Sequence, residues 1–295
     1  MDEKKVTKWQ KKITVTHHPV EAGSCLSSST GLSRGRVKLA MKNGAVWVKK
    51  GKKRRRIRHA KRMVSPGETL EIYYDEALLT ATPPEAWCLK DTEHYSIWFK
   101  PAGLLTQGSL YGDHFSLERK ADIHFASTRH IHPVHRLDRE TAGLVILAHG
   151  RKSAALLSEL FREGRVEKIY RAEVAGDLST SSAGPFIDFP LDGKEAKTEF
   201  FIESVNAESR TSTVLVRLHT GRLHQIRRHF DAIGHPVMGD PRYGKGNKNT
   251  FGLRLAAIRL SFLCPHLRRD VVFTTDETLP DPIFNPVTKT QLSVM

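Results

Sequence analysis

The pattern of apolar and polar residues predicts strands and helices that alternate over the larger, C-terminal part of the chain. An unbroken apolar run predicts a buried strand over residues 141–148, and leucines at helical spacing predict a helix over 153–162. Period-two alternation predicts strands over 166–174 and 213–218. A helix over 223–233 follows and stops at a glycine. Such alternation is typical of a domain in which helices pack on a sheet.

A smaller unit precedes this region. Ser33 is a suitable N-cap for a short helix, and Asn43-Gly44 ends that helix in a turn before an apolar strand. A second turn and a second strand follow, and the prolines at 83 and 84 are typical of a linker. The sequence therefore predicts a basic flexible arm (1–20), a small α+β domain (21–82) and a large domain (83–295).

The charge balance points to a polyanionic partner. The chain has 47 Lys and Arg against 32 Asp and Glu, which gives a formal net charge of +15. Nucleic acid is the most common partner of so basic a protein, although a basic surface can also serve solubility alone. Ten of the fourteen residues over 49–62 are Lys or Arg, and we expect a basic loop there that contacts phosphates. A cationic loop without a defined partner is the alternative.

Several classes of protein are not expected. The longest apolar run is far too short to span a membrane, and the N-terminus lacks the apolar core of a signal peptide. The three cysteines, Cys25, Cys88 and Cys264, form no CxxC pair, which argues against a disulfide framework and against a cysteine-based zinc site. These features predict a cytoplasmic location.

The densest polar stretch lies immediately before the predicted strand at 141–148. Asp138 stands there between Arg136 and Arg139, and a neighbouring guanidinium would keep its carboxyl group ionised, as a nucleophile or base requires. A structural ion pair at a strand end is the alternative interpretation. Three nearby histidines lack the spacing of a known zinc motif, so we expect no metal site at His130, His132 and His135.

A second polar stretch follows a glycine turn at Gly221. The first turns of the predicted helix carry Arg222, His224, Gln225 and Arg227, and Arg227 is placed to reach into a cleft. The alternatives are a solvated basic helix face and contacts to phosphate.

Three motifs in these stretches resemble those of one enzyme family. HRLDRETAGLVILA at 135–148, KIYRAEVAG at 168–176 and GRLHQIRRHFDAIGHPVMGDPRYG at 221–244 are similar to motifs of the RluA-type pseudouridine synthases. FKPAGLLTQG at 99–108 is similar to a fourth segment of that family. The resemblance implies an α/β (α+β) catalytic domain with a central mixed, mostly antiparallel sheet flanked by helices.

The resemblance also implies roles for individual residues. Asp138 matches the catalytic aspartate that attacks the target uridine at C1′ or C6, Tyr170 the tyrosine that stacks on the uracil, and Arg227 the arginine that pairs with the aspartate. Arg136 matches an arginine that fills the space of the flipped nucleotide, and Leu255 an apolar residue near the base. The residues expected to bind substrate RNA are Arg136, Leu255, Arg222, His224, Gln225, Lys52, Lys53, Arg54, Arg55 and Arg56.

The chemistry of uridine isomerisation agrees with these roles. The base must leave the stack, so the site needs an aromatic platform, a space-filling side chain and positive charge. One carboxylate can act as the nucleophile or base, and no metal or organic cofactor is expected. Apolar walls that exclude water would retain the detached uracil.

The small domain at 21–82 resembles, less specifically, the S4-like RNA-binding module that precedes many such catalytic domains. The whole chain is thus expected to modify tRNA or rRNA as a monomer. Two competing functions remain: an RNA-binding or assembly factor that has lost the chemistry, and a nuclease or glycosidase. The last would require a metal cluster or a second placed carboxylate, and neither signature is evident.

Overall fold

The computed structural model describes residues 8–181 and 184–275, and these form two compact units. The first unit contains the described residues up to 83 together with 107–123, and the second contains 84–106 with the described residues from 124 onward. In place of one continuous domain over 83–295, a segment of that region thus folds with the N-terminal unit.

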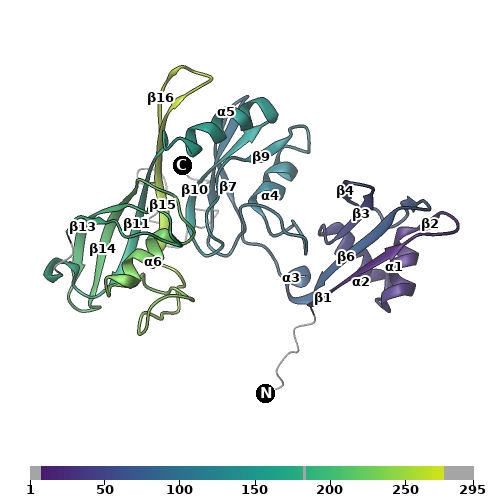
Figure 1. Cartoon of the computed structure of the whole chain (residues 1–295), viewed down its shortest axis with the longest axis horizontal. Coiled ribbons are helices and arrows are strands. Elements are labelled where there is room, and N and C mark those ends of the chain that lie inside the picture. The colour runs from purple at the N-terminus through teal and green to yellow at the C-terminus, as the bar shows by residue number, and fades with distance from the viewer. Residues whose placement is uncertain (1–7, 182–183, 276–295) are drawn as a thin grey trace. The chain divides into compact units, whose positions relative to one another are not determined.

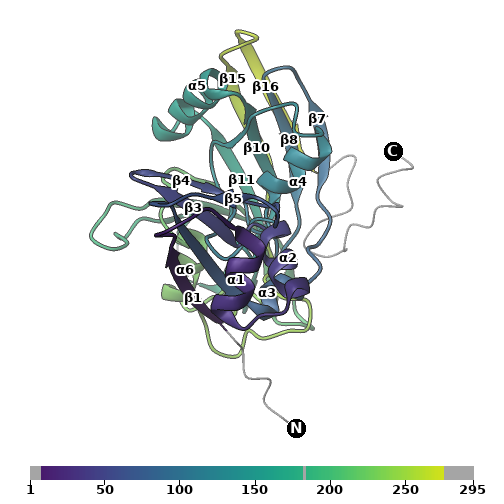
Figure 2. The same cartoon turned by 90° about the vertical axis from the view of Figure 1, so that its right-hand side faces the viewer.

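The first unit is a sheet of four strands covered by helices. The strand order is β1-β6-β3-β4, and α1 and α2 lie side by side (Figure 2) with buried apolar side chains that join those of β3 and β6. Ser33 caps α2, since its side chain accepts a hydrogen bond from the amide of Arg36. The elements of this unit are β1 (Lys8–Thr14), β2 (Val20–Glu21), α1 (Ala22–Thr30), α2 (Arg34–Lys42), β3 (Val46–Lys50), β4 (Lys53–Arg56), β5 (Met63–Val64), β6 (Thr69–Asp75), α3 (Glu76–Thr80) and most of α4 (Leu117–His124).

Two expectations for this unit are wrong. The flexible arm at 1–20 contains β1, which pairs with β6 over its whole length because Trp9 and Ile13 pack on the apolar core; residues 1–7 lie outside the described part. The basic loop at 49–62 is largely a hairpin of β3 and β4, with four backbone pairings from Trp47↔Arg56 to Lys50↔Lys53.

The second unit is built on a large sheet. Its strand order is β12-β13-β14-β11-β15-β10-β8-β7, with β16 paired to β15 and β9 paired to β10 (Figure 1). Only β10 and β15 pair in parallel among the described strands, so the predicted mixed, mostly antiparallel sheet is confirmed. Its elements are β7 (Trp87–Asp91), β8 (Tyr95–Lys100), β9 (Ile131–Pro133), β10 (Ala142–His149), α5 (Arg151–Arg162), β11 (Glu167–Ala175), a 3-10 turn (Leu178–Thr180), β12 (Phe186–Ile187), β13 (Thr198–Asn206), β14 (Thr211–Leu218), α6 (Gln225–Ala232), β15 (Leu255–Cys264) and β16 (Arg269–Thr274).

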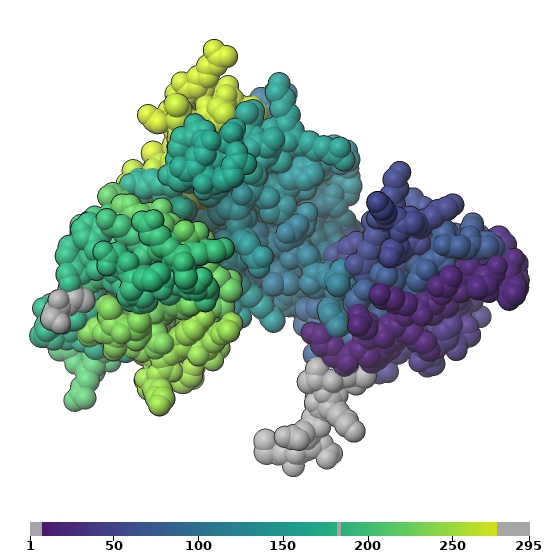
Figure 3. Space-filling view, in the orientation of Figure 1, coloured from purple at the N-terminus to yellow at the C-terminus, as the bar shows by residue number. Residues whose placement is uncertain are grey.

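The larger of two apolar clusters in the second unit lies on the face of the sheet that α5 covers. Leu157 and Leu160 of α5 pack against buried residues of β10, where all eight positions but the last are buried. The far end of the β15–β16 hairpin projects beyond the rest of this unit (Figure 3, yellow). No helix within 8–181 and 184–275 is both long enough and apolar enough to cross a membrane.

Candidate active site

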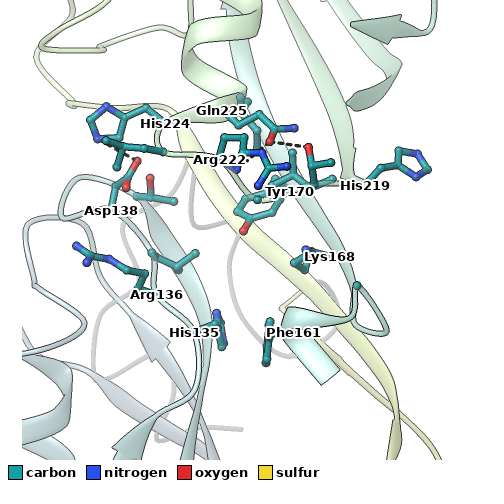
Figure 4. Close-up of a pocket in the computed structure, with 18 of the residues that line it drawn as sticks. His135, Arg136, Asp138, Phe161, Lys168, Tyr170, His219, Arg222, His224 and Gln225 are labelled. Atoms are coloured by element: carbon teal, nitrogen blue, oxygen red, sulfur yellow. Dashed lines mark hydrogen bonds and ion pairs between the residues drawn. The ribbon is translucent and has the colours of Figure 1, made fainter. Parts of the chain in front are cut away.

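A cavity of about 900 Å³ opens in the second unit between the loop before β10, strand β11 and the start of α6. Asp138, Tyr170 and Arg136 line it (Figure 4), as do Arg227 and Leu255. They come from segments far apart in the sequence, and the fold brings together the residues expected at the site.

The loop that carries Asp138 is fixed from the segment after β8. Thr106 Oγ1 both donates to the carbonyl of Leu137, at 3.0 Å, and accepts from its amide, at 3.1 Å. Lys100 Nζ donates to the carbonyls of Leu104 at 2.8 Å, Pro101 at 3.1 Å and Arg139 at 3.3 Å. Leu137 and Arg139, on either side of Asp138, are therefore both tied to the segment from Lys100 to Thr106.

Lys100 is fully buried, and its ammonium group is held by backbone carbonyls instead of a carboxylate. Burial lowers its pKa to about 7, although the charges of Glu140 and Asp138 act in the opposite direction. Neither Lys100 nor Thr106 was singled out from the sequence. Both stand in the FKPAGLLTQG segment, which was the available signal.

Arg227 links Asp138 to a second, buried carboxylate. Its guanidinium donates to Asp240 through Nε at 2.7 Å and Nη2 at 2.8 Å, and to Asp138 Oδ2 through Nη1 at 3.3 Å. Arg227 is 2% exposed and Asp240 is 0% exposed. Burial acts to raise the pKa of Asp240, but Arg227 and the amides of Arg242 and Tyr243 outweigh it and hold that pKa below its usual value.

The pair of Arg227 with Asp138, which the family resemblance implied, is present in the structure. Arg139 directs its Nε to the carbonyl of Gly103, and no hydrogen bond or ion pair between Asp138 and Arg136 occurs among the described residues. The cation at Asp138 is Arg227, which reaches it from α6. Asp240, the residue that orients this arginine, was missed, although it stands in the third motif.

His224 occupies the other side of Asp138. Its Nε2 lies 3.6 Å from Asp138 Oδ2, and its Nδ1 lies 3.0 Å from the hydroxyl of Tyr243. If Tyr243 donates to Nδ1, then Nε2 carries the proton and faces the carboxylate, so Tyr243 selects the tautomer that suits Asp138. His224 has a left-handed backbone with φ of 52°, so α6 begins at Gln225 and not at 223 as predicted.

Gln225 and Arg222 line the cavity, but both also hold the turn before α6. Gln225 is 3% exposed and accepts from Thr220 and from the amide of Arg222, while its amide group donates to Lys197 and Thr198. Because these bonds are internal, Gln225 supports the turn instead of offering polar atoms to RNA. Arg222 donates its Nε to the carbonyl of Glu195 at 2.7 Å.

Tyr170 and Leu255 supply the apolar part of the cavity. Tyr170 is buried on β11 beside β15, which carries Leu255 with 4% exposure. Burial and the nearby charge of Asp138 raise the pKa of the Tyr170 phenol, so the ring stays neutral at physiological pH. A neutral aromatic ring beside a carboxylate suits a flat, uncharged base.

The basic residues at 52–56 belong to the first unit. Arg54 pairs with Glu71 and lies 4.7 Å from the ring of Trp47, and Arg56 pairs with Asp113 at 3.1 Å. These two arginines therefore serve the packing of the unit itself. The members of the run that are exposed and whose side chains form no hydrogen bond or ion pair with another described residue are Lys52, Lys53 and Arg55.

Comparisons with known proteins agree on one family. The RNA pseudouridylate synthase profile matches residues 94–232. A dual-specificity RNA pseudouridine synthase of Vibrio vulnificus is 33% identical over 213 residues, covering 64% of this chain and 83% of that protein. A tRNA pseudouridine synthase C of Haemophilus ducreyi is 32% identical over 174 residues, covering 51% of this chain and 70% of that protein.

A solved structure shares the fold. Human RNA pseudouridylate synthase domain containing 1 superimposes with a TM-score of 0.57 and 20% identity, covering 72% of this chain and 96% of that one.

Proposed function

The chain belongs to the RNA pseudouridine synthase family, and from this premise we propose that Asp138, Tyr170 and Arg227 carry out the isomerisation of uridine in structured tRNA or rRNA. The family resemblance expected from the sequence is thereby confirmed, and the chain is an RNA-modifying isomerase. The observation that carries the proposal is the position of Asp138 Oδ2, 3.3 Å from a buried arginine, in the cavity that Tyr170 lines.

The reaction needs only side chains of this chain. The N1–C1′ bond of the uridine breaks, the uracil turns, and a C5–C1′ bond forms while the C5 hydrogen leaves as a proton and N1 takes one up. Asp138 supplies the attacking carboxylate, at C1′ or at C6, and Arg227 donates a hydrogen bond that orients it. The apolar wall at Leu255 keeps water from the detached base.

Entry of the base requires it to leave its stack. Tyr170 would receive the uracil on its ring, and the exposed Arg136 at the rim would fill the space that the nucleotide leaves. The site is complete within one chain, which supports a monomer. An RNA substrate in the cytoplasm suits the reduced cysteines, Cys25, Cys88 and Cys264.

The test is release of tritium from RNA labelled at C5 of uridine, using purified protein. Total tRNA and rRNA from a strain that lacks the protein are assayed as separate pools. Release from one pool supports the proposed chemistry and identifies the substrate class. Tight RNA binding without release from either pool would favour an RNA-binding factor that has lost the chemistry.

Replacement of Tyr170 separates stacking from other roles. We expect Tyr170→Phe to keep kcat/KM within a few-fold of the original, whereas Tyr170→Ala lowers it roughly 5- to 150-fold, because one base–aromatic stack contributes about 1–3 kcal/mol. Tritium release under steady-state conditions measures both variants, and thermal unfolding checks that each is folded. Equal activity of the two variants would contradict the platform role.

We propose that the first unit is an S4-like RNA-binding unit whose β3–β4 hairpin contacts phosphates. Replacing Lys52, Lys53 and Arg55 together by Gln should weaken RNA binding and reduce the slope of log K against log salt by about two to three. Filter binding at several salt concentrations measures the slope, and the single-turnover rate at saturating RNA should stay unchanged. An unchanged slope would place the hairpin outside the RNA interface.

A further inference from the structure

Lys168 lines the active-site cavity but takes no part in the chemistry proposed for Asp138, Tyr170 and Arg227. It stands on β11 two residues before Tyr170 and lines the same cavity, between Tyr170 and the pair His135 and Phe161 (Figure 4). Residues two positions apart on a strand are separated by about 6.6 Å. The ammonium group of Lys168 therefore lies farther along β11 than the ring of Tyr170, on the side away from Asp138.

The ammonium group of Lys168 has no counterion within the described part of the chain. It forms no hydrogen bond or ion pair with another described residue, although it is only partly exposed. Burial alone lowers its pKa, and no carboxylate offsets this effect. Lys100 differs, because three backbone carbonyls hold its ammonium group. A partly buried cation without a counterion lowers the stability of the protein unless a bound anion pairs with it.

The neighbouring side chains His135 and Phe161 provide no counterion for Lys168. His135 is engaged, since its Nε2 accepts from the amide of Ile146 at 2.9 Å and its ring stacks on Phe161 at 4.2 Å. Burial lowers the pKa of His135 to about 3, so this imidazole is neutral and adds no charge.

The charges that line the rest of the cavity are mostly positive. The two carboxylates of the lining, Asp138 and Glu163, are paired with Arg227 and Arg165. The cations of the lining, apart from Arg227, are Arg136, Arg162, Lys168 and Arg222. Arg162 is paired with Glu159, and Arg222 donates to the carbonyl of Glu195. The lining thus carries more cations than carboxylates, which favours an anion in the cavity.

We propose that Lys168 binds a backbone phosphate beside the target uridine, so that this end of the cavity holds the RNA strand while the base occupies Tyr170. The proposal rests on the proposed function, because it takes RNA as the ligand. Phosphate is favoured over a uracil carbonyl because it is the group of RNA that carries a full negative charge, and an unpaired ammonium group is stabilised most by such a charge.

The first experiment compares the full-length Lys168→Met variant with Lys152→Met, whose side chain is exposed on α5 and does not line the cavity. Both variants lose one charge, so the comparison removes the effect of net charge. With bulk tRNA as the probe, Lys168→Met should reduce the salt slope by about one more than the control does. Lys168→Arg should restore the slope. Identical slopes for the two Met variants would overturn the proposal.

The second experiment uses a short RNA hairpin in which single phosphates next to the uridine are replaced by uncharged methylphosphonates. One replacement should weaken binding by the wild-type protein several-fold and should add nothing to the effect of Lys168→Met. Independent, multiplicative effects at every position would overturn the proposal and favour a base contact or a structural role. Lys168→Gln is carried through the same scan, so the pairing of one phosphate with this side chain can be tested even if Lys168→Met fails to fold.

The two proposals fail differently. If the wild-type protein releases no tritium from any RNA pool, the proposed function fails. The salt slope of Lys168→Met still reports whether a phosphate contact exists.

Discussion

Asp138→Asn should abolish tritium release while RNA binding persists. The substitution keeps the shape of the side chain but removes the charge, and an amide cannot act as the attacking group. Loss of a nucleophile typically costs on the order of 10⁴- to 10⁶-fold in rate. The fold should tolerate the change, because Asp138 is 22% exposed and Arg227 keeps both of its bonds to Asp240.

Glu140→Gln is the matched control for Asp138→Asn. Its carboxylate lies 4.0 Å from Arg227 and is 39% exposed, so the variant removes a neighbouring charge without touching the proposed nucleophile. We expect this control to retain activity within a few-fold. Measurable release by Asp138→Asn at a rate near that of the control would reject Asp138 as the catalytic carboxylate, and equal loss of RNA binding would indicate a binding role instead.

Arg227→Met should destabilise the protein as well as inactivate it. The substitution leaves the fully buried carboxylate of Asp240 without its cation, and among the residues that the structure describes its remaining hydrogen-bond donors are the amides of Arg242 and Tyr243. Removing one partner of a buried ion pair typically costs about 3–5 kcal/mol. Denaturant unfolding measures this cost as a lower midpoint, and tritium release measures the accompanying loss of activity.

Two further variants separate stability from catalysis at this pair. Arg228→Met on the same helix removes an exposed pair with Asp192, which is 70% exposed, and should cost less than about 1 kcal/mol. Arg227→Met combined with Asp240→Leu should regain much of the lost stability, because no unpaired charge remains buried, yet stay inactive because Asp138 still lacks its arginine. A single Arg227→Met variant as stable as Arg228→Met would show that the buried pair contributes little.

The extent to which the fold could be predicted depended on how apolar each element is. The buried strand β10 and the helix α5 have continuous apolar patterns, and their predicted bounds agree with the structure to within two residues. Strand β1 was missed because Lys11 interrupts the face that Trp9 and Ile13 form. Strand β4 consists of Lys and Arg alone, and its backbone pairing with β3 leaves no signal in side-chain polarity.

The residues of the candidate site were found through motifs, and the family resemblance also supplied the pairing of Arg227 with Asp138. Arg227 and Asp138 are 89 residues apart, and only the folded sheet brings the two side chains together. Proximity along the chain alone favoured Arg136 and Arg139 as partners for Asp138, and the distant Arg227 was reached only through the resemblance. Supporting residues such as Asp240 and Thr106 act through contacts that no local pattern encodes.

The composition of the first unit from two separate segments has a consequence for protein synthesis. Trp47 donates its indole N–H to the carbonyl of Leu110, and the carboxylate of Asp113 accepts hydrogen bonds from Arg56 and Arg58. A nascent chain that ends at residue 83 lacks these partners, so the unit cannot finish folding until the ribosome has also translated residues 107–123. At typical elongation rates this delay is on the order of seconds. During that interval the aromatic and basic face around Trp47 is uncovered, and a fragment cut at residue 83 would keep it so.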